Sequence, residues 1–202
     1  MSSLVSTGDD AIASIEATRR RLSGRQAATV QRLAEAAVDE LRAVGYDGLT
    51  VRNVARRAGV ASATAYTYFA SREHLVTEVF WRRLDGLAAA SVDRRRTRAA
   101  RVSTTLGEIA LLVADEPELA AACTVAMLAG DPEVKHLRDR IGMDVRRRLV
   151  VALGDDAAPI ELTTIELAFF GALVQAGGGH LAYTDLPALL DDVVAQVVGS
   201  GR

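Results

Sequence analysis

The segment from Leu49 to Leu75, LTVRNVARRAGVASATAYTYFASREHL, constrains the fold of this chain more than any other stretch. Between Thr50 and Ala58 the apolar residues recur at spacings of three and four, and the intervening positions are mostly Arg and Asn. Gly59 then opens a short turn, and a second short helix follows that ends near Phe69. Two short helices joined by such a turn form a helix-turn-helix.

Local chemistry supports both helices of this motif. Thr50 is suited to cap the first helix, and Gly59 most easily adopts the left-handed conformation that ends it. In the second helix Ala65 and Phe69 are expected to face the core. The remaining small, hydroxylated or aromatic side chains are candidates for a DNA major groove. They are Ser62, Ala63, Thr64, Tyr66, Thr67 and Tyr68.

These residues resemble the pattern of the TetR family of bacterial repressors. The resemblance rests on Thr50, Ala58-Gly59-Val60, Thr64, Tyr66, Tyr68, Phe69 and Ser71-Arg72-Glu73. The sequence departs from the family at Ala61, where a capping Ser or Thr is usual, and at Ser62-Ala63, which replace a common Lys-Gly pair. A cap moved to Ser62 would shift the start of the second helix by one residue.

The charge distribution favours a polyanionic partner for the N-terminal half. Residues 1–101 carry 17 Arg against 11 acids, a net charge of +6, whereas residues 102–202 carry −8. The basic half contains the helix-turn-helix, and phosphate neutralisation drives much of the affinity for DNA. The alternative is that solvated Arg-rich helix faces account for the excess.

Within the motif, specific side chains are expected to contact double-stranded DNA. Ser62, Thr64 and Thr67 are assigned to the groove, with Ala63 beside them. The residues assigned to phosphates are Thr50, Arg52, Tyr66, Tyr68 and Arg72, and Arg25 is also expected to contact DNA. Arg72 falls at the positive end of a helix dipole, an unfavourable position that a phosphate would relieve.

The composition excludes several classes of protein. The single cysteine, Cys123, excludes an intrachain disulfide and suits a reducing, cytoplasmic location. No apolar run reaches the length of about 18 residues that a membrane span needs, and the N-terminus lacks the features of a signal peptide. His74, His136 and His180 have no partners at metal-binding spacing, and no catalytic motif is present. We therefore expect no enzyme, metal or cofactor.

The rest of the chain is expected to be all-helical, with about nine helices in total. We predict an arm over residues 1–23, a DNA-binding domain over 24–70 and a helical body over 71–202. An arm rich in Arg either enters the minor groove or serves as a solubilising tail. The helices outside the motif are expected at Arg25–Val44, Ser71–Val92, Val102–Ala114, Pro117–Ala129, Pro132–Leu153, Pro159–Leu181 and Leu186–Val198.

The last two predicted helices are apolar around most of their circumference. The resemblance implies that residues of about 159–181 and 186–198 form a four-helix interface in a homodimer. Two-fold symmetry would place two recognition helices roughly 34–36 Å apart on a near-palindromic operator. The alternative is that these helices close the core of a monomer.

The resemblance also implies a small-molecule effector in a cavity of the body. An apolar or lipid-like effector, such as a fatty acyl compound or a drug, fits the supply of Met, Leu and aromatic residues. The candidate lining residues are Trp81, Leu106, Ile109, Cys123, Met127, Met143, Phe169 and Leu173. The function so implied is that of a ligand-responsive transcriptional repressor. Its alternatives are an architectural DNA-binding dimer without an effector and a helical lipid-binding protein that has lost DNA binding.

Overall fold

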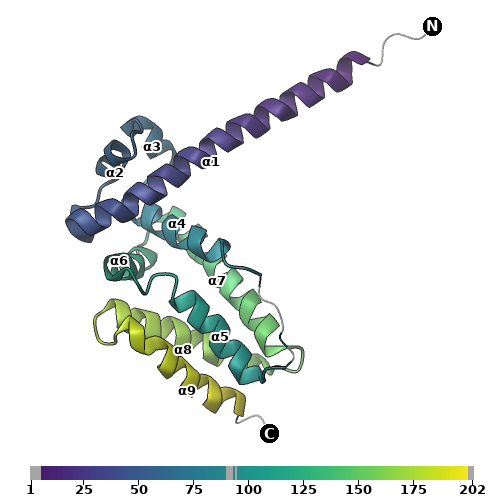
Figure 1. The fold of residues 1–202 in the computed structure, drawn as a ribbon, viewed down its shortest axis with the longest axis vertical. Coiled ribbons are helices and arrows are strands. Elements are labelled where there is room, and N and C mark those ends of the chain that lie inside the picture. Colours follow the sequence, from purple (N-terminus) through teal and green to yellow (C-terminus); the bar gives the residue numbers. More distant parts are fainter. Residues whose placement is uncertain (1–5, 90–92, 94, 200–202) are drawn as a thin grey trace.

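The computed structural model describes the backbone of residues 6–89, 93 and 95–199, and side chains from residue 24 onward. Over these residues the protein has nine α-helices, one short 3-10 helix and no strand, as the sequence predicts. Figure 1 shows the head, α1 to α3, above a body of the remaining helices. The helices are α1 Ser6–Gly48, α2 Val51–Arg57, α3 Ser62–Tyr68, α4 Arg72–Asp85, α5 Arg98–Ala110, α6 Pro117–Met127, α7 Pro132–Leu153, α8 Pro159–Gly177, η1 Tyr183–Asp185 and α9 Leu186–Gly199.

The first helix is longer than the sequence suggests. An arm was expected over residues 1–23, whereas α1 begins at Ser6 and continues through the position predicted for the helix start at Arg25. Ala and Arg, which have high helix propensity, recur between Ala11 and Arg21, and this favours the extension. Its C-terminal end agrees with the prediction, because Gly45 has φ 69° and ψ 179° and interrupts the helix there.

The head is held together by apolar side chains and by two arginines. Leu33 and Leu41 of α1 and Val54 of α2 are buried with Ala65 and Phe69, which confirms that the last two face the core. Arg57 of α2 pairs with the buried carboxylate of Glu40 on α1, with a 2.6 Å distance between Nε and Oε2. A second arginine, Arg72, ties the end of α1 to the first turn of α4, as described below.

Several helix boundaries differ from the predicted ones. The helix expected over Ser71–Val92 ends at Asp85, and the one expected over Val102–Ala114 is shifted to Arg98–Ala110. The helix expected over Pro117–Ala129 ends at Met127, and the one expected over Pro159–Leu181 ends at Gly177. By contrast, Pro132–Leu153 is confirmed, and Leu186–Val198 is extended by one residue.

Tertiary contacts and caps explain these shifts. Helix α4 ends at the C-cap Gly86, and Arg148 of α7 donates to the carbonyls of Leu84, Leu87 and Ala88 at this end. Thr97 accepts a hydrogen bond from the amide of Ala100, which starts α5 earlier than predicted. After Gly177, Gly179 adopts φ 75° and ends α8 in a turn.

Among the described residues, α8 alone is long and apolar enough to span a membrane by length and composition. The helix contains Glu161 and Glu166, so it is not an uninterrupted apolar run of the length considered from the sequence. These two acidic residues of α8 are paired with arginines of other segments, Glu161 with Arg98 and Glu166 with Arg146. The helix also packs against α6, α7 and α9, and these contacts favour a core helix with one uncovered face.

Candidate DNA-binding surface and ligand cavity

The turn of the helix-turn-helix forms as its sequence predicts. The Thr50 hydroxyl accepts a 3.1 Å hydrogen bond from the amide of Asn53, and Gly59 adopts φ 63°. Helix α3 begins at Ser62 with Ala61 as its N-cap, and no side chain caps it. The shift of the cap to Ser62 that the sequence suggested does not occur. Ala61 already has the extended conformation of a cap residue, and its carbonyl accepts from the amide of Ala65.

The outward face of α3 carries the side chains assigned to the groove. Ala63, Thr64, Tyr66 and Thr67 are exposed, and half of the Tyr66 surface is accessible. Ser62 and Tyr68 are only partly exposed, and Tyr68 packs against the core. The Thr67 hydroxyl donates to the carbonyl of Thr64 at 2.6 Å, which leaves its lone pairs to accept.

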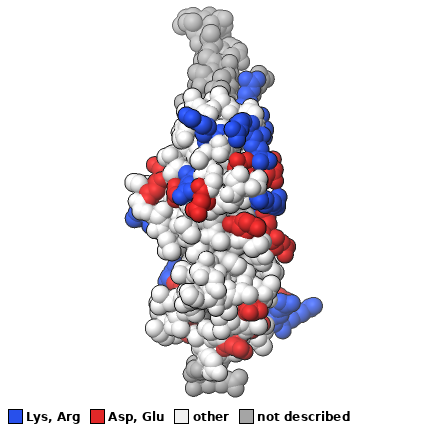
Figure 2. All heavy atoms as spheres, turned by 90° about the vertical axis from the view of Figure 1, so that its left-hand side faces the viewer, with Lys and Arg blue, Asp and Glu red and all other residues white. Residues whose placement is uncertain are grey.

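Arginines next to α3 differ in whether a protein group binds them. Arg52 and Arg56 of α2 are exposed, and their guanidinium groups have no partner in the described part of the chain. Arg25 is likewise exposed on α1. Figure 2 looks onto the side with α2 and α3 and shows basic side chains gathered on its upper part, above a mostly uncharged body. The head therefore presents free cations beside α3.

Arg72 lies in a different setting from the one predicted. Its Nε donates to Glu73 at 2.9 Å and its Nη1 to the carbonyl of Tyr46 at 2.9 Å. The guanidinium also stacks 4.4 Å from the Tyr46 ring centroid. Protein groups, rather than a phosphate, thus relieve the unfavourable position at the start of α4. Burial, together with the Glu73 carboxylate, raises the pKa of Tyr46 to about 12.

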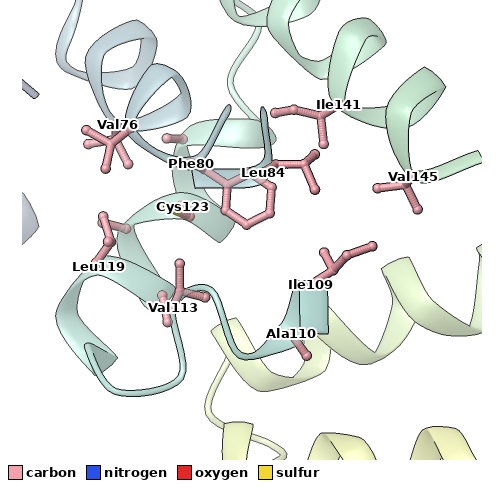
Figure 3. Close-up of a cluster of buried hydrophobic side chains, with 14 of the residues drawn as sticks. Val76, Phe80, Leu84, Ile109, Ala110, Val113, Leu119, Cys123, Ile141 and Val145 are labelled. Carbon is pink, nitrogen blue, oxygen red and sulfur yellow. The ribbon is translucent and has the colours of Figure 1, made fainter. Parts of the chain in front are cut away.

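A cavity of about 360 Å³ lies inside the body, among α4, α5, α6, α7, α8 and η1. Figure 3 shows Phe80 of α4 pointing into the space between Cys123, Ile109 and Ile141. Five of the predicted lining residues border this cavity, namely Ile109, Cys123, Met127, Phe169 and Leu173.

Three other predicted lining residues lie elsewhere. Trp81 is covered by Arg140, whose guanidinium carbon is 4.4 Å from its ring centroid. Leu106 is fully buried but packs outside the cavity lining, and Met143 is 65% exposed on α7. On α4, Val76, Phe80 and Leu84 recur every four residues and are buried, so this period identifies Phe80 rather than Trp81 as the inward aromatic residue.

The cavity lining also includes residues outside the predicted set. Its polar members are few. The hydroxyls of Thr124 and Tyr183 are 3.2 Å apart, within hydrogen-bonding distance, and burial raises the pKa of the Cys123 thiol to about 12. The unpredicted lining residues are Phe80, Val113, Ala120, Thr124, Leu128, Arg138, Ile141, Gly142, Val145, Phe170, Val174 and Tyr183.

Within the described residues, no group of three or more His, Cys, Asp or Glu side chains is placed to hold a metal ion. The chemistry available in the cavity is therefore mainly apolar contact, with a few hydrogen-bonding groups and one guanidinium.

Known proteins share both the motif and the architecture. The model of the bacterial regulatory proteins of the tetR family matches residues 33–79. An uncharacterised HTH-type transcriptional regulator of Mycobacterium tuberculosis is 46% identical over 180 residues, which cover 88% of this chain and 84% of the relative.

Solved structures of low sequence identity have the same fold. A TetR transcriptional regulator from Rhodococcus sp. RHA1 superposes with a TM-score of 0.72 at 19% identity, over 89% of this chain and 99% of that one. The transcriptional regulator FadR from Bacillus subtilis, in complex with stearoyl-CoA, gives 0.57 at 17% identity, over 85% and 99%. Together with the helix-turn-helix and the high identity of the mycobacterial relative, these matches show that the chain belongs to the TetR family of bacterial transcriptional regulators.

Proposed function

We propose that this regulator is a homodimeric repressor that binds a near-palindromic operator and is released by a small hydrophobic effector. The observation that carries the proposal is the apolar cavity, because its wall includes Phe80 of α4. The first turn of the same helix is bonded to the head through Arg72. A ligand in the cavity therefore touches an element that also positions the helix-turn-helix.

The proposed DNA contacts follow from exposure and free charge. Thr64 and Thr67 of α3 are the groove-facing residues, and Tyr66 lies on the same exposed surface. Arg52 and Arg56 are assigned to phosphates because no protein group in the described region competes for them. The setting of Arg72 assigns it to bracing the head rather than to DNA.

The proposed dimer is supported by the uncovered faces of α8 and α9. Large apolar side chains are exposed on both helices, and exposure of this kind in neighbouring elements is typical of an interface. They are Ile160 (68% exposed), Leu167 (70%), Phe170 (37%), Val174 (46%) and Leu189 (42%). A second copy of the chain covering this surface would set two α3 helices about one DNA turn apart.

The proposed release of DNA requires coupling between cavity and head. Helix α4 packs against α1 in the head and against α6 and α7 in the body. Ser71, the N-cap of α4, donates to Asp131, the N-cap of α7, at 2.6 Å, and Arg83 of α4 pairs with Glu116 at 2.6 Å. A ligand that favours a different packing of α6 and α7 would therefore move α4. The ligand releases DNA only to the extent that it binds the conformation without DNA more tightly than the DNA-binding conformation.

The effector class follows from the lining. A volume of about 360 Å³ falls near the lower end of the range of roughly 300–1,000 Å³ typical of small-molecule sites. The solved structure of FadR with stearoyl-CoA supports an effector with a long apolar part for this protein as well. Because its partner is DNA, we place the action of the regulator in the cytoplasm.

The test is a footprint on DNA upstream of the protein's own gene, with salt titration and a thermal-shift screen of hydrophobic compounds. We expect two protected half-sites one DNA turn apart, binding that weakens steeply with salt, and loss of the footprint with any compound that raises the melting temperature. If none of the compounds that raise the melting temperature removes the footprint, an architectural DNA-binding dimer is favoured instead.

A further inference from the structure

The cavity has one charged residue among its described lining residues, Arg138 of α7. The other lining side chains are apolar apart from Cys123, Thr124 and Tyr183. Arg138 is half-buried, so part of its guanidinium is shielded from water. A cation beside an apolar cavity is unfavourable unless a partner binds it.

Protein groups bind only one part of the Arg138 guanidinium. The Nη1 group of Arg138 donates to the carbonyls of Met127 at 2.5 Å and Ala129 at 3.5 Å, at the end of α6. No carboxylate of the described residues lies within ion-pair distance of Arg138, and its Nε and Nη2 groups make no hydrogen bond there. The Nε–Nη2 edge of a guanidinium is well suited to bind a carboxylate or phosphate with two parallel hydrogen bonds.

Two other arginines that bind helix-end carbonyls also pair with a carboxylate, whereas Arg101, like Arg138, donates only to carbonyls. Arg83 donates to the carbonyl of Leu112 and also pairs with Glu116. Arg148 donates to carbonyls at the end of α4 and also pairs with Asp144. Each of these two arginines thus has both a carbonyl and a carboxylate partner. Arg138 donates only to carbonyls, and the neighbouring Asp139 carboxylate acts on it electrostatically without forming an ion pair. Unlike Arg101, Arg138 lines the apolar cavity.

The position of Arg138 relative to the cavity opening also fits a head group. The two carbonyls that it binds, those of Met127 and Ala129, flank Leu128. Leu128 lines the cavity and is 66% exposed, which identifies this end of α6 as part of the cavity mouth. A ligand with its apolar body inside would therefore bring its polar end to Arg138.

We propose that the effector is an amphiphile with an apolar body and an anionic head, carboxylate or phosphate, which Arg138 binds at the mouth of the cavity. The inference rests on the proposed function, because it assigns the chemical class of the effector for that same cavity. The proposal excludes amphiphiles with cationic heads, because the guanidinium would repel them. Neutral amphiphiles are expected to bind more weakly than anionic ones.

The experiment compares four probes of equal chain length by isothermal titration calorimetry, each below its micelle concentration. The probes are dodecanoate, dodecyl phosphate, dodecanol and dodecyltrimethylammonium. At pH 8 we expect the better of the two anions to bind the wild type about tenfold or more tightly than dodecanol, and the ammonium probe to bind most weakly. The order of the two anions identifies which head group the site prefers.

Substitutions test whether Arg138 is the residue that causes the preference for anions. Arg138→Gln is expected to remove the preference for anions over dodecanol, whereas Arg138→Lys, which keeps the charge but not the planar fork, retains part of it. Arg140→Gln is the matched control, because it removes the same charge from the same helix at a residue that covers Trp81 and lies outside the cavity lining. It should leave the preference unchanged.

The probe comparison needs no variant, so it decides the proposal even if Arg138→Gln does not fold. Equal binding of anion and alcohol by the wild type overturns the head-group site and leaves the hydrophobic effector in place. A preference for anions that survives in folded Arg138→Gln also overturns it. Failure of all four probes to bind overturns the head-group site together with the proposed effector class.

Discussion

The arginines of the head differ in their partners more than in their spacing along the chain. Arg57 is paired with Glu40 and Arg72 with Glu73, whereas Arg52 and Arg56 have no protein partner in the described region. All four are polar positions of amphipathic helices, so periodicity treats them alike. Which of them is available to phosphates depends on acids that lie up to 17 residues away in the chain.

Arg52→Ala is therefore expected to weaken binding to operator and to random DNA to a similar degree. A lost phosphate contact should reduce the slope of log affinity against log salt by about 1. Fluorescence anisotropy over a salt series measures this slope. Arg95→Ala is the control, because Arg95 is an exposed body residue whose side chain has no protein partner in the described part of the chain. An unchanged slope for Arg52→Ala would remove it from the DNA surface.

The single cysteine is expected to be unreactive in the folded protein. Burial raises the pKa of the Cys123 thiol from its ordinary value to about 12, so thiolate is scarce at pH 8. The contribution of this thiol to stability is accordingly present below pH 9 and is lost as the pH rises from about 9 to 12. Alkylation by iodoacetamide at pH 8, followed by mass spectrometry, should be slow until denaturant is added. Native alkylation at the rate of free cysteine would contradict the burial.

Among the elements, α3 has the least local support. It spans seven residues and its N-cap is Ala61, which offers no side-chain acceptor. By contrast, Thr50 caps α2 and Ser71 caps α4 through their hydroxyls. The fold of α3 therefore depends on Ala65 and Phe69, which anchor it to the core.

Ala61→Ser is expected to raise the free energy of unfolding by about 1 kcal/mol, since a hydroxyl at the N-cap would bind a free amide of the first turn. Urea denaturation followed by circular dichroism measures the change. Ala63→Ser makes the same chemical change two residues further along, at a position that caps nothing, and should not stabilise. Equal effects of the two substitutions would refute the capping explanation.

Helices α6 and α8 approach closely at Gly177. A Cβ atom built at this position would overlap the Thr124 side chain on α6. Gly177→Ala should therefore force the two helices apart and cost about 1–3 kcal/mol of stability. Gly107→Ala, within α5, meets nothing within 4 Å and should be neutral or slightly stabilising. Thermal denaturation of both variants checks the contrast, and similar melting temperatures would show that the contact is not tight.

At the scale of the whole molecule, α8 and α9 carry apolar surface that the single chain leaves uncovered. Among the residues whose side chains are described, Leu167 is the most exposed large apolar one, at 70%. Because it packs little within the chain, its replacement by a charge should disrupt an interface without disrupting the fold.

Leu167→Glu is accordingly expected to convert a dimer into a monomer with unchanged helical content. Light scattering coupled to size-exclusion chromatography measures the mass, and circular dichroism the helicity. Leu111→Glu is the control, because Leu111 is 61% exposed at the end of α5 and lies outside α8 and α9. A wild-type monomer, or a dimer that persists in Leu167→Glu, would contradict the proposed interface.

The sequence by itself determined the parts of the protein that depend on near neighbours along the chain. The period of apolar residues, the caps Thr50 and Ser71 and the left-handed Gly59 act within a few residues, so the motif, its turn and the helical class were predictable. The family resemblance rested on the same local residues. Proline at a first helical turn likewise set the start of α7 at Pro132.

The tertiary structure decided what depends on residues distant in sequence. Arg148 binds a carbonyl at the end of α4 from 64 residues away, and Arg140 of α7 covers Trp81 outside the cavity. The cavity and its one cation among the described lining residues, Arg138, form only when five helices of the body pack together. Packing of the head likewise decides which of its described arginines are paired with protein groups and which are free. A helical period identifies the apolar face of one helix, but the partner of each face and charge is set by packing between helices.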